Sequence, residues 1–280
     1  MTAGPTARSW LGHDAGQLER RWRVPRVLAF ERVGSTNDIA RRLAERGAAP
    51  GTVVIAATQT AGRGRLGRRW HDSPGASLLL SVVLRPPSAA HTGTTGPLPL
   101  RVGLACARAL ERTIPLAITL KWPNDLLLDD RKVGGILCEA ALAPSGGFIV
   151  AGVGINVAQT AQQLPSDLRA DATSLTIATG RAIRVEDVAD AVLPQLQRLA
   201  TQPLALLDRE EARELVRRDV CAGRQLTVDA AGHASTLRGT GAGIELDGRL
   251  RIRLPDGRLT RVAAGTVRLD APTLTTDGTA

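Results

Sequence analysis

Short apolar runs rich in β-branched residues recur through the first 157 residues and predict the strands of a sheet. The runs lie at residues 27–30, 53–58, 77–84, 117–120, 126–128, 133–141 and 148–157. Apolar residues recur at helical spacing between these runs only at residues 39–47 and 100–110. Because short loops and few helices separate the strands, we predict a mixed β-sheet with helices on one side. This is an α+β fold rather than a doubly wound one.

The second half of the chain changes from helical to β patterning. Residues 186–199 and 204–220 are amphipathic and predict two helices. After Gly223, arginines and apolar residues alternate over residues 249–254 with a period of two, which predicts a small five-stranded antiparallel barrel. The predicted parts of the chain are an N-terminal extension (1–24), a main domain (25–222), the barrel (223–270) and a disordered tail (271–280).

Composition narrows the possible functions only a little. The 280 residues are 43% hydrophobic with a formal net charge of +9, so a partner that bears phosphates or carboxylates fits the charge balance. Cys106, Cys138 and Cys221 form no CxxC pair, which favours a reducing compartment. No apolar run is long enough to span a bilayer, and the N-terminus lacks a signal-peptide core. We therefore expect a cytoplasmic protein.

Two lysines mark residues 119–137 as a candidate site. Of the 36 Lys and Arg residues, only Lys121 and Lys132 are lysines. Lysine carries a compact ammonium on a flexible stem, whereas arginine carries a wide planar fork. Two retained lysines therefore suggest a site that needs a point charge, although chance survival of two surface lysines explains the count equally well.

A loop rich in glycine and arginine follows the expected strand at 53–58. Residues 61–70 contain three glycines, four arginines and Trp70. Glycine lets backbone N–H groups approach an anion, and arginine supplies a forked donor for phosphate. The alternatives are a basic surface loop or a nucleic-acid contact. The P-loop pattern is absent, and no helical pattern follows Trp70, so the GxGxxG spacing of these glycines is not a dinucleotide motif.

Ser35, Thr36 and Asn37 form a turn between a predicted strand and a predicted helix. Either hydroxyl can cap the helix. The turn can equally present two hydroxyls and an amide to a polar ligand. The two interpretations remain open from the sequence.

Four groups of residues, in this order, resemble the motifs of biotin protein ligases, the biotin–[acetyl-CoA-carboxylase] ligases. They are Ser35-Thr-Asn, Gln59 with Gly62-Arg-Gly-Arg, Lys121-Trp-Pro-Asn-Asp with Lys132-Val-Gly-Gly, and Gly152-Val-Gly-Ile-Asn. The resemblance covers roughly residues 28–270. It implies a catalytic domain like that of class II aminoacyl-tRNA synthetases, followed by an SH3-like barrel. About 30 residues precede the first motif. These are too few for the N-terminal DNA-binding domain of some members, so we expect the catalytic-only type.

This resemblance implies an ATP-dependent ligase. Biotin and MgATP would give biotinyl-5′-AMP and pyrophosphate, and the biotinyl group would then pass to one lysine of a biotin carboxyl carrier domain of a carboxylase. The expected substrates are thus biotin and ATP with Mg²⁺, and the expected protein partner is the carrier domain. We expect a monomer or homodimer without specific DNA binding and without a membrane partner.

The resemblance also assigns roles to individual residues. Lys132 would be catalytic by bridging the biotin carboxylate and the α-phosphate, and Arg65 by holding phosphate oxygens in a loop that closes over the product. The expected biotin-binding residues are Ser35, Thr36, Asn37, Gln59, Arg63, Gly64, Arg65, Lys132, Gly134 and Gly135. The expected ATP-binding residues are Arg63, Arg65, Arg68, Trp70, Asn124, Lys132 and Asn156. Asp125 is the candidate Mg²⁺ ligand.

The sequence departs from the family pattern at two places. Thr60 stands where many relatives carry a second Gln, and residues 265–269 differ from the usual last strand, so a C-terminal contact to ATP would depend on Arg268. A lipoate–protein ligase shares the fold and the adenylate chemistry, but it uses a different lysine motif and needs no Ser, Thr and Gln set. A nucleic-acid-binding protein would carry aromatic residues among the basic ones, and only Trp70 qualifies. A scaffold that has kept an inactive ligase fold conflicts with the intact motifs.

Overall fold

A mixed sheet forms the centre of the computed structural model, which describes residues 9–86, 96–143, 146–203, 206–230 and 236–270. Its strands are β3 Val27–Val33, β4 Val53–Gln59, β5 Ser77–Leu84, β6 Thr119–Lys121, β7 Asp125–Leu128, β8 Arg131–Ala143 and β9 Gly146–Asn156. They lie in the order β3-β4-β5-β9-β8-β7-β6. β3 and β4 are parallel and all other neighbours are antiparallel, so the α+β mixed sheet predicted from the sequence is confirmed.

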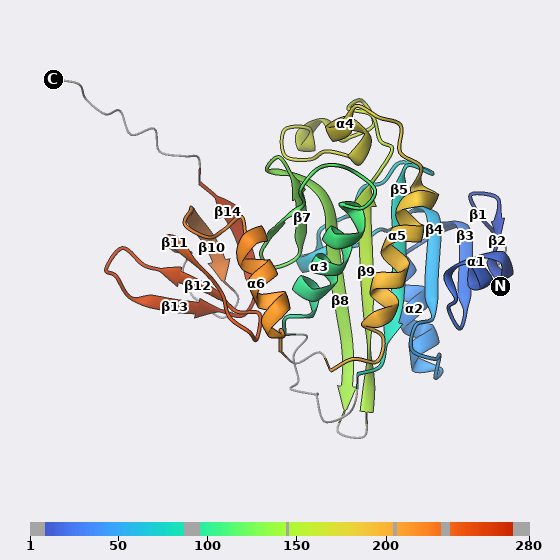
Figure 1. Cartoon of the computed structure of the whole chain (residues 1–280), viewed down its shortest axis with the longest axis horizontal. Helices are drawn as coiled ribbons and strands as arrows, with labels where there is room; N and C mark the ends of the chain where they lie inside the picture. The colour runs from blue at the N-terminus through green and yellow to red at the C-terminus, as the bar shows by residue number, and fades with distance from the viewer. Residues whose placement is uncertain (1–8, 87–95, 144–145, 204–205, 231–235, 271–280) are drawn as a thin grey trace.

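Helices cover both faces of this sheet (Figure 1). α3 (Leu98–Leu110) and α5 (Val185–Arg198) pack on one face, and α2 (Thr36–Glu45) packs against β4, β5 and β9 on the other. The prediction of helices on one side only is wrong. β5 is buried along its whole length, because an apolar strand in the middle of a sheet must be covered on both faces.

Alternation along β9 distinguishes the two faces. Ala151 and Val153 lie in the core beneath α3 and α5. Gly152 and Gly154 point the other way, since a Cβ on Gly152 would meet Asn37 of α2. The sheet therefore has an apolar face beneath α3 and α5, and a face toward α2 that carries glycines beside a smaller apolar cluster.

Residues 9–24 extend the same core at the β3 edge. β1 (Ser9–Trp10), β2 (His13–Asp14) and α1 (Ala15–Trp22) form this segment. Asp14 begins α1 through a capping box with Gln17. The rings of Trp10 and Trp22 meet edge to face at 5.9 Å, and both are buried in the core beneath α3 and α5. This apolar contact ties the segment to the sheet.

A second, five-stranded sheet follows α6 (Arg209–Arg218). Its strands are β10 Gln225–Ala230, β11 Leu237–Ile244, β12 Leu250–Arg253, β13 Leu259–Val262 and β14 Gly265–Leu269. They lie in the order β13-β12-β11-β10-β14, and every pair is antiparallel, as the period-two alternation predicts. Residues 204–205 of the predicted helix at 204–220, and the predicted tail at 271–280, lie outside the described residues.

Contacts from the turns on either side of β7 help to hold this second sheet against the main domain. The buried indole of Trp122 donates from Nε1 to the carbonyl oxygen of Gly248 at 2.9 Å. Arg224 pairs with Asp130, in the turn between β7 and β8, at 2.9 Å. Because Trp122 lies two residues before Asn124 in the turn between β6 and β7, this turn anchors the second sheet and carries a candidate site residue.

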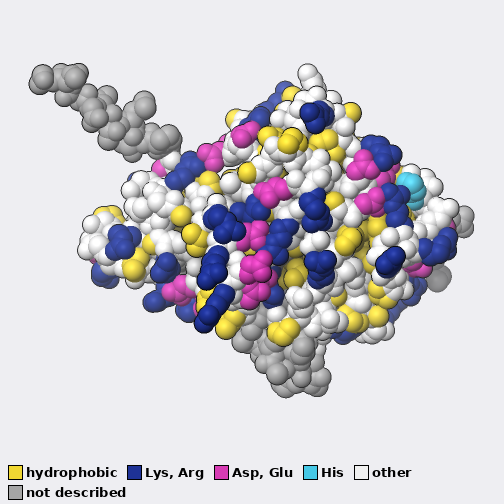
Figure 2. Space-filling model, viewed as in Figure 1, with side chains coloured by type: hydrophobic (Ala, Val, Ile, Leu, Met, Phe, Trp, Pro, Cys, Tyr) yellow, Lys and Arg dark blue, Asp and Glu magenta, His cyan; other side chains and the backbone are white. Residues whose placement is uncertain are grey.

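Most arginines on the visible face are mixed with acidic side chains (Figure 2). Arg101 of α3 pairs with Glu211 of α6 at 2.8 Å, and Arg218 pairs with Glu214 within α6 at 2.8 Å. The net positive charge is therefore partly neutralised locally and forms no continuous basic stripe on this face. In the part of the chain that the structure describes, no helix is long and apolar enough to cross a membrane.

Candidate active site

A cavity of about 670 Å³ opens on the glycine-bearing face of the sheet, beside α2. Every predicted site residue except Gly134 lines it: Ser35, Thr36, Asn37, Gln59, Arg63, Gly64, Arg65, Arg68, Trp70, Asn124, Asp125, Lys132, Gly135 and Asn156. Gly134 points toward the apolar core, where a Cβ would lie 3.0 Å from Leu126. The sequence motifs therefore converge on one place, although they span more than a hundred residues.

Lys132 and Lys121 meet at one carboxylate. Lys132 Nζ lies 2.6 Å from Asp125 Oδ1, and Lys121 Nζ lies 3.8 Å from Asp125 Oδ2. Both lysines of the sequence thus line the same cavity, which favours the site interpretation over chance survival. Since the Lys132 side chain is still 37% exposed, its ammonium is accessible to a ligand in the cavity.

A β-bulge explains why Lys132 faces the cavity. β7 pairs Asp125 with Gly135 but Leu127 with Lys132, so Val133 is an extra residue in β8. Residues opposite each other in a ladder share a face, and the extra residue shifts the alternation by one. Val133 therefore enters the core, and Lys132 points to the same side as Asp125.

Neutral polar groups line the opposite end of the cavity. Thr36 donates its backbone N–H to Gln59 Oε1 at 2.7 Å, and the Thr36 hydroxyl lies 3.1 Å from the same oxygen. Ser35 occupies the N-cap position of α2 but makes no capping bond, so the capping interpretation is wrong for this hydroxyl. Ser81, which sequence reasoning missed, lies behind this end, with its Oγ 2.8 Å from Thr36 Oγ1. Its only sequence signal is a polar residue inside an apolar strand.

The side-chain amide of Asn37 is fully engaged within the protein. Its Oδ1 lies 2.6 Å from Ser81 Oγ, and its Nδ2 donates to Glu139 Oε2 at 2.8 Å and to the Leu137 carbonyl at 3.3 Å. A Cβ on Gly152 would lie 2.1 Å from Asn37 Oδ1, so only glycine admits the amide there. Asn37 borders the cavity and organises the residues around it.

The loop between β4 and β5 folds over the cationic end. A short 3₁₀ turn, η1 (Arg65–Gly67), is closed by a bond from Gly64 N–H to the Arg68 carbonyl at 2.7 Å. Leu66 adopts a positive φ of 55° and is 70% exposed at the tip of the loop. Arg65 Nη1 reaches Asn124 Oδ1 at 3.5 Å. Burial lowers the pKa of the Arg65 guanidinium, an effect that nearby Asp125 opposes, so an anionic ligand would stabilise its charged form.

Trp70 lies flat on two glycines. A Cβ on Gly154 would come within 2.7 Å of its indole, and a Cβ on Gly135 within 3.1 Å. The Lys132 ammonium lies 5.8 Å from the ring centroid. Gly135, expected to leave room for a substrate ring, thus makes room for the indole in this structure.

Two predicted ATP-binding amides already have partners. Asn156 donates to the Thr173 carbonyl at 3.0 Å and accepts from Gln159 at 3.1 Å. Asn124 donates from Nδ2 to the Ile136 carbonyl at 2.7 Å. Both residues line the cavity, and both also hold neighbouring segments in place.

Two further segments line the cavity, and the sequence pointed only to Arg268 of the second. Leu164, Pro165 and Leu168 line it from the connection that contains η3 (Ser166–Leu168) and precedes α4 (Leu175–Thr179). Residues 265–269, which form β14, line it from the second sheet. Arg268 is among them and pairs with Asp229 at 3.0 Å. The first segment carries no motif, and only the folded chain brings it to the cavity.

No group of three or more His, Cys, Asp or Glu residues is placed to hold a metal ion within the described ranges. Asp125, the predicted Mg²⁺ ligand, is already shared by two lysines. Mg²⁺ often keeps several waters and binds through one or two carboxylates together with substrate phosphates. The donors here fit a Mg²⁺ that arrives with a nucleotide better than a resident ion.

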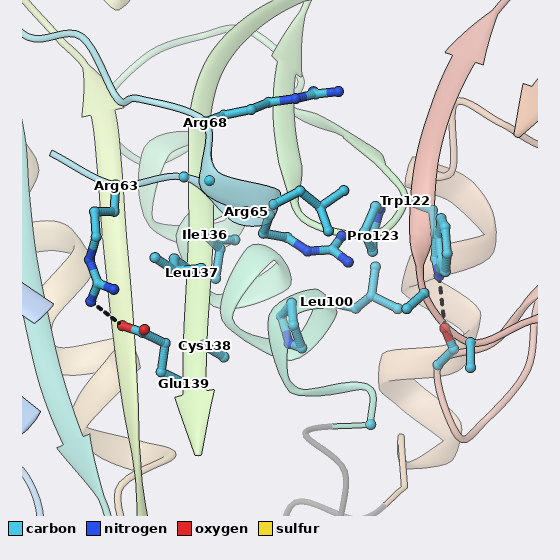
Figure 3. A pocket seen from close by; sticks show the side chains of 18 residues that line it. Arg63, Arg65, Arg68, Leu100, Trp122, Pro123, Ile136, Leu137, Cys138 and Glu139 are labelled. Carbon is cyan, nitrogen blue, oxygen red and sulfur yellow. Dashed lines mark hydrogen bonds and ion pairs between the residues drawn. The ribbon is translucent and has the colours of Figure 1, made fainter. Parts of the chain in front are cut away.

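A second cavity of about 470 Å³ shares the arginine loop with the first, and Figure 3 shows the side chains that line it. Arg63 and Arg65 line both cavities, so the loop is the wall between them. Glu139 lines only the second cavity, where it pairs with Arg63. Cys138 lies beside it, and burial raises the pKa of its thiol above the usual range.

Comparison with known proteins assigns the chain to a family. Residues 29–156 match the model of the biotin/lipoate A/B protein ligase family. A biotin–[acetyl-CoA-carboxylase] ligase of Mycobacterium tuberculosis is 36% identical over 85% of this chain and 77% of that relative. The chain belongs to the biotin protein ligase family. The resemblance inferred from the motifs is thereby confirmed.

A solved structure supports the same family. The biotin protein ligase from Aquifex aeolicus, in complex with biotin and ATP, superposes with a TM-score of 0.72 at 26% identity, covering 87% of this chain and 99% of that one.

The bifunctional ligase/repressor BirA of Bacillus subtilis is 36% identical over 56% of this chain and 48% of its own length. The chain spans about half the length of the two Bacillus ligase/repressors that it matches.

Proposed function

We propose that this protein activates biotin with ATP and transfers the biotinyl group to a lysine of a biotin carboxyl carrier domain. In the first step a carboxylate oxygen of biotin attacks the α-phosphorus of ATP, which forms biotinyl-5′-AMP and releases pyrophosphate. In the second step the amine of the acceptor lysine attacks the acyl carbon, which forms an amide and releases AMP.

One observation carries this proposal: a single cavity has a neutral hydrogen-bonding end and a cationic end. Ser35, Thr36 and Gln59 line the neutral end, and they suit a ureido group, which both donates and accepts hydrogen bonds. Lys132 and Arg65 line the cationic end, which suits a carboxylate and phosphates. Biotin carries a ureido group and a carboxylate at opposite ends of one molecule.

Lys132 has the central role in the proposed first step. It is a compact ammonium that can lie between the biotin carboxylate and the α-phosphate and stabilise the charge that develops there. Its partner Asp125 holds the ammonium 2.6 Å away and fixes its position before the anions arrive. Lys121, 3.8 Å from the same carboxylate, keeps that end of the cavity positive while Lys132 contacts the ligand.

The arginine loop would protect the reactive intermediate. A mixed anhydride is hydrolysed readily, so a loop that covers it keeps water away. Arg65 is half-buried at the wall between the two cavities, where a phosphate would offset the cost of its burial. Trp70 would cover the adenine, and Arg68 and Arg268 are among the further arginines that line the cavity. Mg²⁺ would accompany the ATP phosphates, and Asp125 would be its candidate protein ligand.

The proposed protein partner is a carrier domain of a carboxylase. The Mycobacterium tuberculosis relative supports this, because its name gives acetyl-CoA carboxylase as the acceptor. The acceptor lysine of the carrier domain must lose a proton to attack, and Asp125 is the candidate carboxylate to orient it. A cytoplasmic location, a monomeric or homodimeric state and the lack of specific DNA binding stay predictions from the sequence.

A two-step assay tests the proposed function. The protein is incubated with ATP and either biotin or lipoate, and pyrophosphate is measured; a carrier domain is then added and its mass is recorded. We expect pyrophosphate with biotin and a mass increase of one biotinyl group on one lysine. Turnover on lipoate with none on biotin would assign the cavity to a different acid.

A further inference from the structure

Glu139 contacts both α2 and the arginine loop without lining the main cavity. It lies on β8, and its Oε2 accepts a bond from Asn37 Nδ2 at 2.8 Å and one from Arg63 Nη2 at 2.8 Å. The contact with Arg63 crosses from the strand to the loop (Figure 3). One carboxylate oxygen thus joins the helix that begins at the neutral end to the loop at the cationic end.

The bonds on either side of Glu139 are continuous. Ser81 Oγ lies 2.6 Å from Asn37 Oδ1 and 2.8 Å from Thr36 Oγ1, which lies 3.1 Å from Gln59 Oε1. This half of the hydrogen-bond network is buried, since Ser81 is fully buried and Asn37 is 4% exposed. Each member is therefore oriented by the next, because few alternative partners exist in a buried network.

The loop half of the network is charged. Arg63 Nη2 lies 2.8 Å from Glu139 and 2.7 Å from Asp38 of α2. Arg63 is thus bound to two carboxylates at the base of the loop, while Arg65 two residues later faces both cavities. The backbone bond from Gly64 N–H to the Arg68 carbonyl, at 2.7 Å, begins directly after Arg63.

We propose that Glu139 is a positioning residue that couples the neutral end of the main cavity to the arginine loop. The inference rests on the proposed function, because biotin is the ligand of the neutral end. A ureido group held by Ser35, Thr36 and Gln59 restrains the start of α2 and with it Asn37. Asn37 and Glu139 transmit that restraint to Arg63, so biotin alone orders the loop before ATP binds.

Hydrogen exchange of the loop tests this coupling directly. The amide N–H groups of Gly64 and Trp70 report whether the loop is closed. Gly64 N–H donates to the Arg68 carbonyl at 2.7 Å, and Trp70 N–H donates to the Gly62 carbonyl at 3.0 Å. In the unaltered protein we expect saturating biotin to slow their exchange roughly tenfold. In Glu139→Gln, at biotin concentrations that calorimetry shows to be saturating, we expect less than about twofold slowing.

A matched control separates coupling from loss of an ion pair. Glu245 pairs with Arg261 at 2.6 Å, and its side chain is 22% exposed, close to the 23% of Glu139. Because Glu245 lines neither cavity, Glu245→Gln should keep the full effect of biotin on the loop. Asp38→Asn removes the other, more exposed partner of Arg63 and should lower the effect partially, which covers the case of a Glu139 variant that does not fold.

Each outcome decides a different claim. If Glu139→Gln binds biotin and the loop is protected as in the unaltered protein, Glu139 does not couple the two ends. If the unaltered protein binds biotin without any change in loop exchange, the coupling itself is absent although the proposed function stands. If the unaltered protein does not bind biotin at all, the proposed function fails first.

Discussion

The two faces of the central sheet are built from the same strands but serve opposite purposes. Under α3 and α5, β9 contributes Ala151, Val153 and Ile155 to a continuous core. On the other face the same strand contributes Gly152 and Gly154, which leave room for the Asn37 amide and the Trp70 indole. The first face is filled along the strand, whereas the other is filled at Phe148 and Val150 and is hollowed only at the two glycines, where side chains from elsewhere lie on it.

This difference shows how one strand can carry both stability and a binding site. Side chains alternate across a strand, so each face can change without the other. The apolar face stabilises the sheet by burying its side chains beneath two helices. At Gly152 and Gly154 the other face gives up that burial and gains a cavity of about 670 Å³, while Phe148 and Val150 of the same strand stay buried in a cluster with α2. A substitution on each face should therefore affect a different measurement.

The largest effect is expected at the bulge that brings Lys132 to the cavity face. Lys132→Arg keeps the charge but replaces a compact ammonium with a planar fork. The ammonium lies 2.6 Å from Asp125, and the wider fork does not fit between that carboxylate and a ligand. We expect pyrophosphate release with biotin and ATP to fall by about 10²–10³-fold, with an unchanged melting temperature. Near-normal activity would contradict the argument that the site needs a point charge.

Lys121→Arg is the matched comparison for this variant. Lys121 lies at the longer distance of 3.8 Å from the same carboxylate, so a wider side chain has more room there. We expect pyrophosphate release to fall by less than about tenfold. Equal losses in both variants would mean that the two lysines act as one group.

Gly154→Ala should separate the two faces most directly. The new Cβ would lie 2.7 Å from the Trp70 indole, so the ring must move off the strand. We expect activity to fall roughly tenfold to a hundredfold, because small displacements in a catalytic site have large effects on rate. Thermal unfolding should change little, since the alanine side chain faces the cavity. A large loss of stability with normal activity per folded molecule would reverse our assignment of the faces.

The sequence predicts the strands well because each is a local run of apolar residues, and Ser77–Leu84 matches its predicted bounds. It does not predict the second helical layer, since covering β5 on both faces depends on the whole sheet. Lys132 could be predicted from its rarity and motif. Ser81 and Glu139 could not be predicted, because their partners are distant in the sequence. Ser81 lies 44 residues from Asn37, and Glu139 lies 102 residues from Asn37 and 76 from Arg63. The position of Trp70 on Gly154 is hidden for the same reason.

Arg65→Ala tests the loop above the glycine face. Arg65 is half-buried and reaches Asn124, and a charge-assisted bond to phosphate is typically worth about 1.5–3 kcal/mol. We expect biotinyl-AMP to leave the variant at least roughly tenfold faster, measured by its dissociation after rapid gel filtration. A variant that retains the intermediate as long as the unaltered protein would show that another group closes the cavity.

The smallest effect is expected on the opposite face, at Ile155. This side chain is fully buried beneath the helices, and Ile155→Val removes one methylene from a closely fitted core. We expect the free energy of unfolding to fall by about 0.5–1.5 kcal/mol, measured by denaturant titration. Pyrophosphate release per folded molecule should stay unchanged, because Ile155 and the cavity lie on opposite faces of β9. A change in activity without a change in stability would mean that β9 transmits small shifts from the core to the site, and that its faces are not independent.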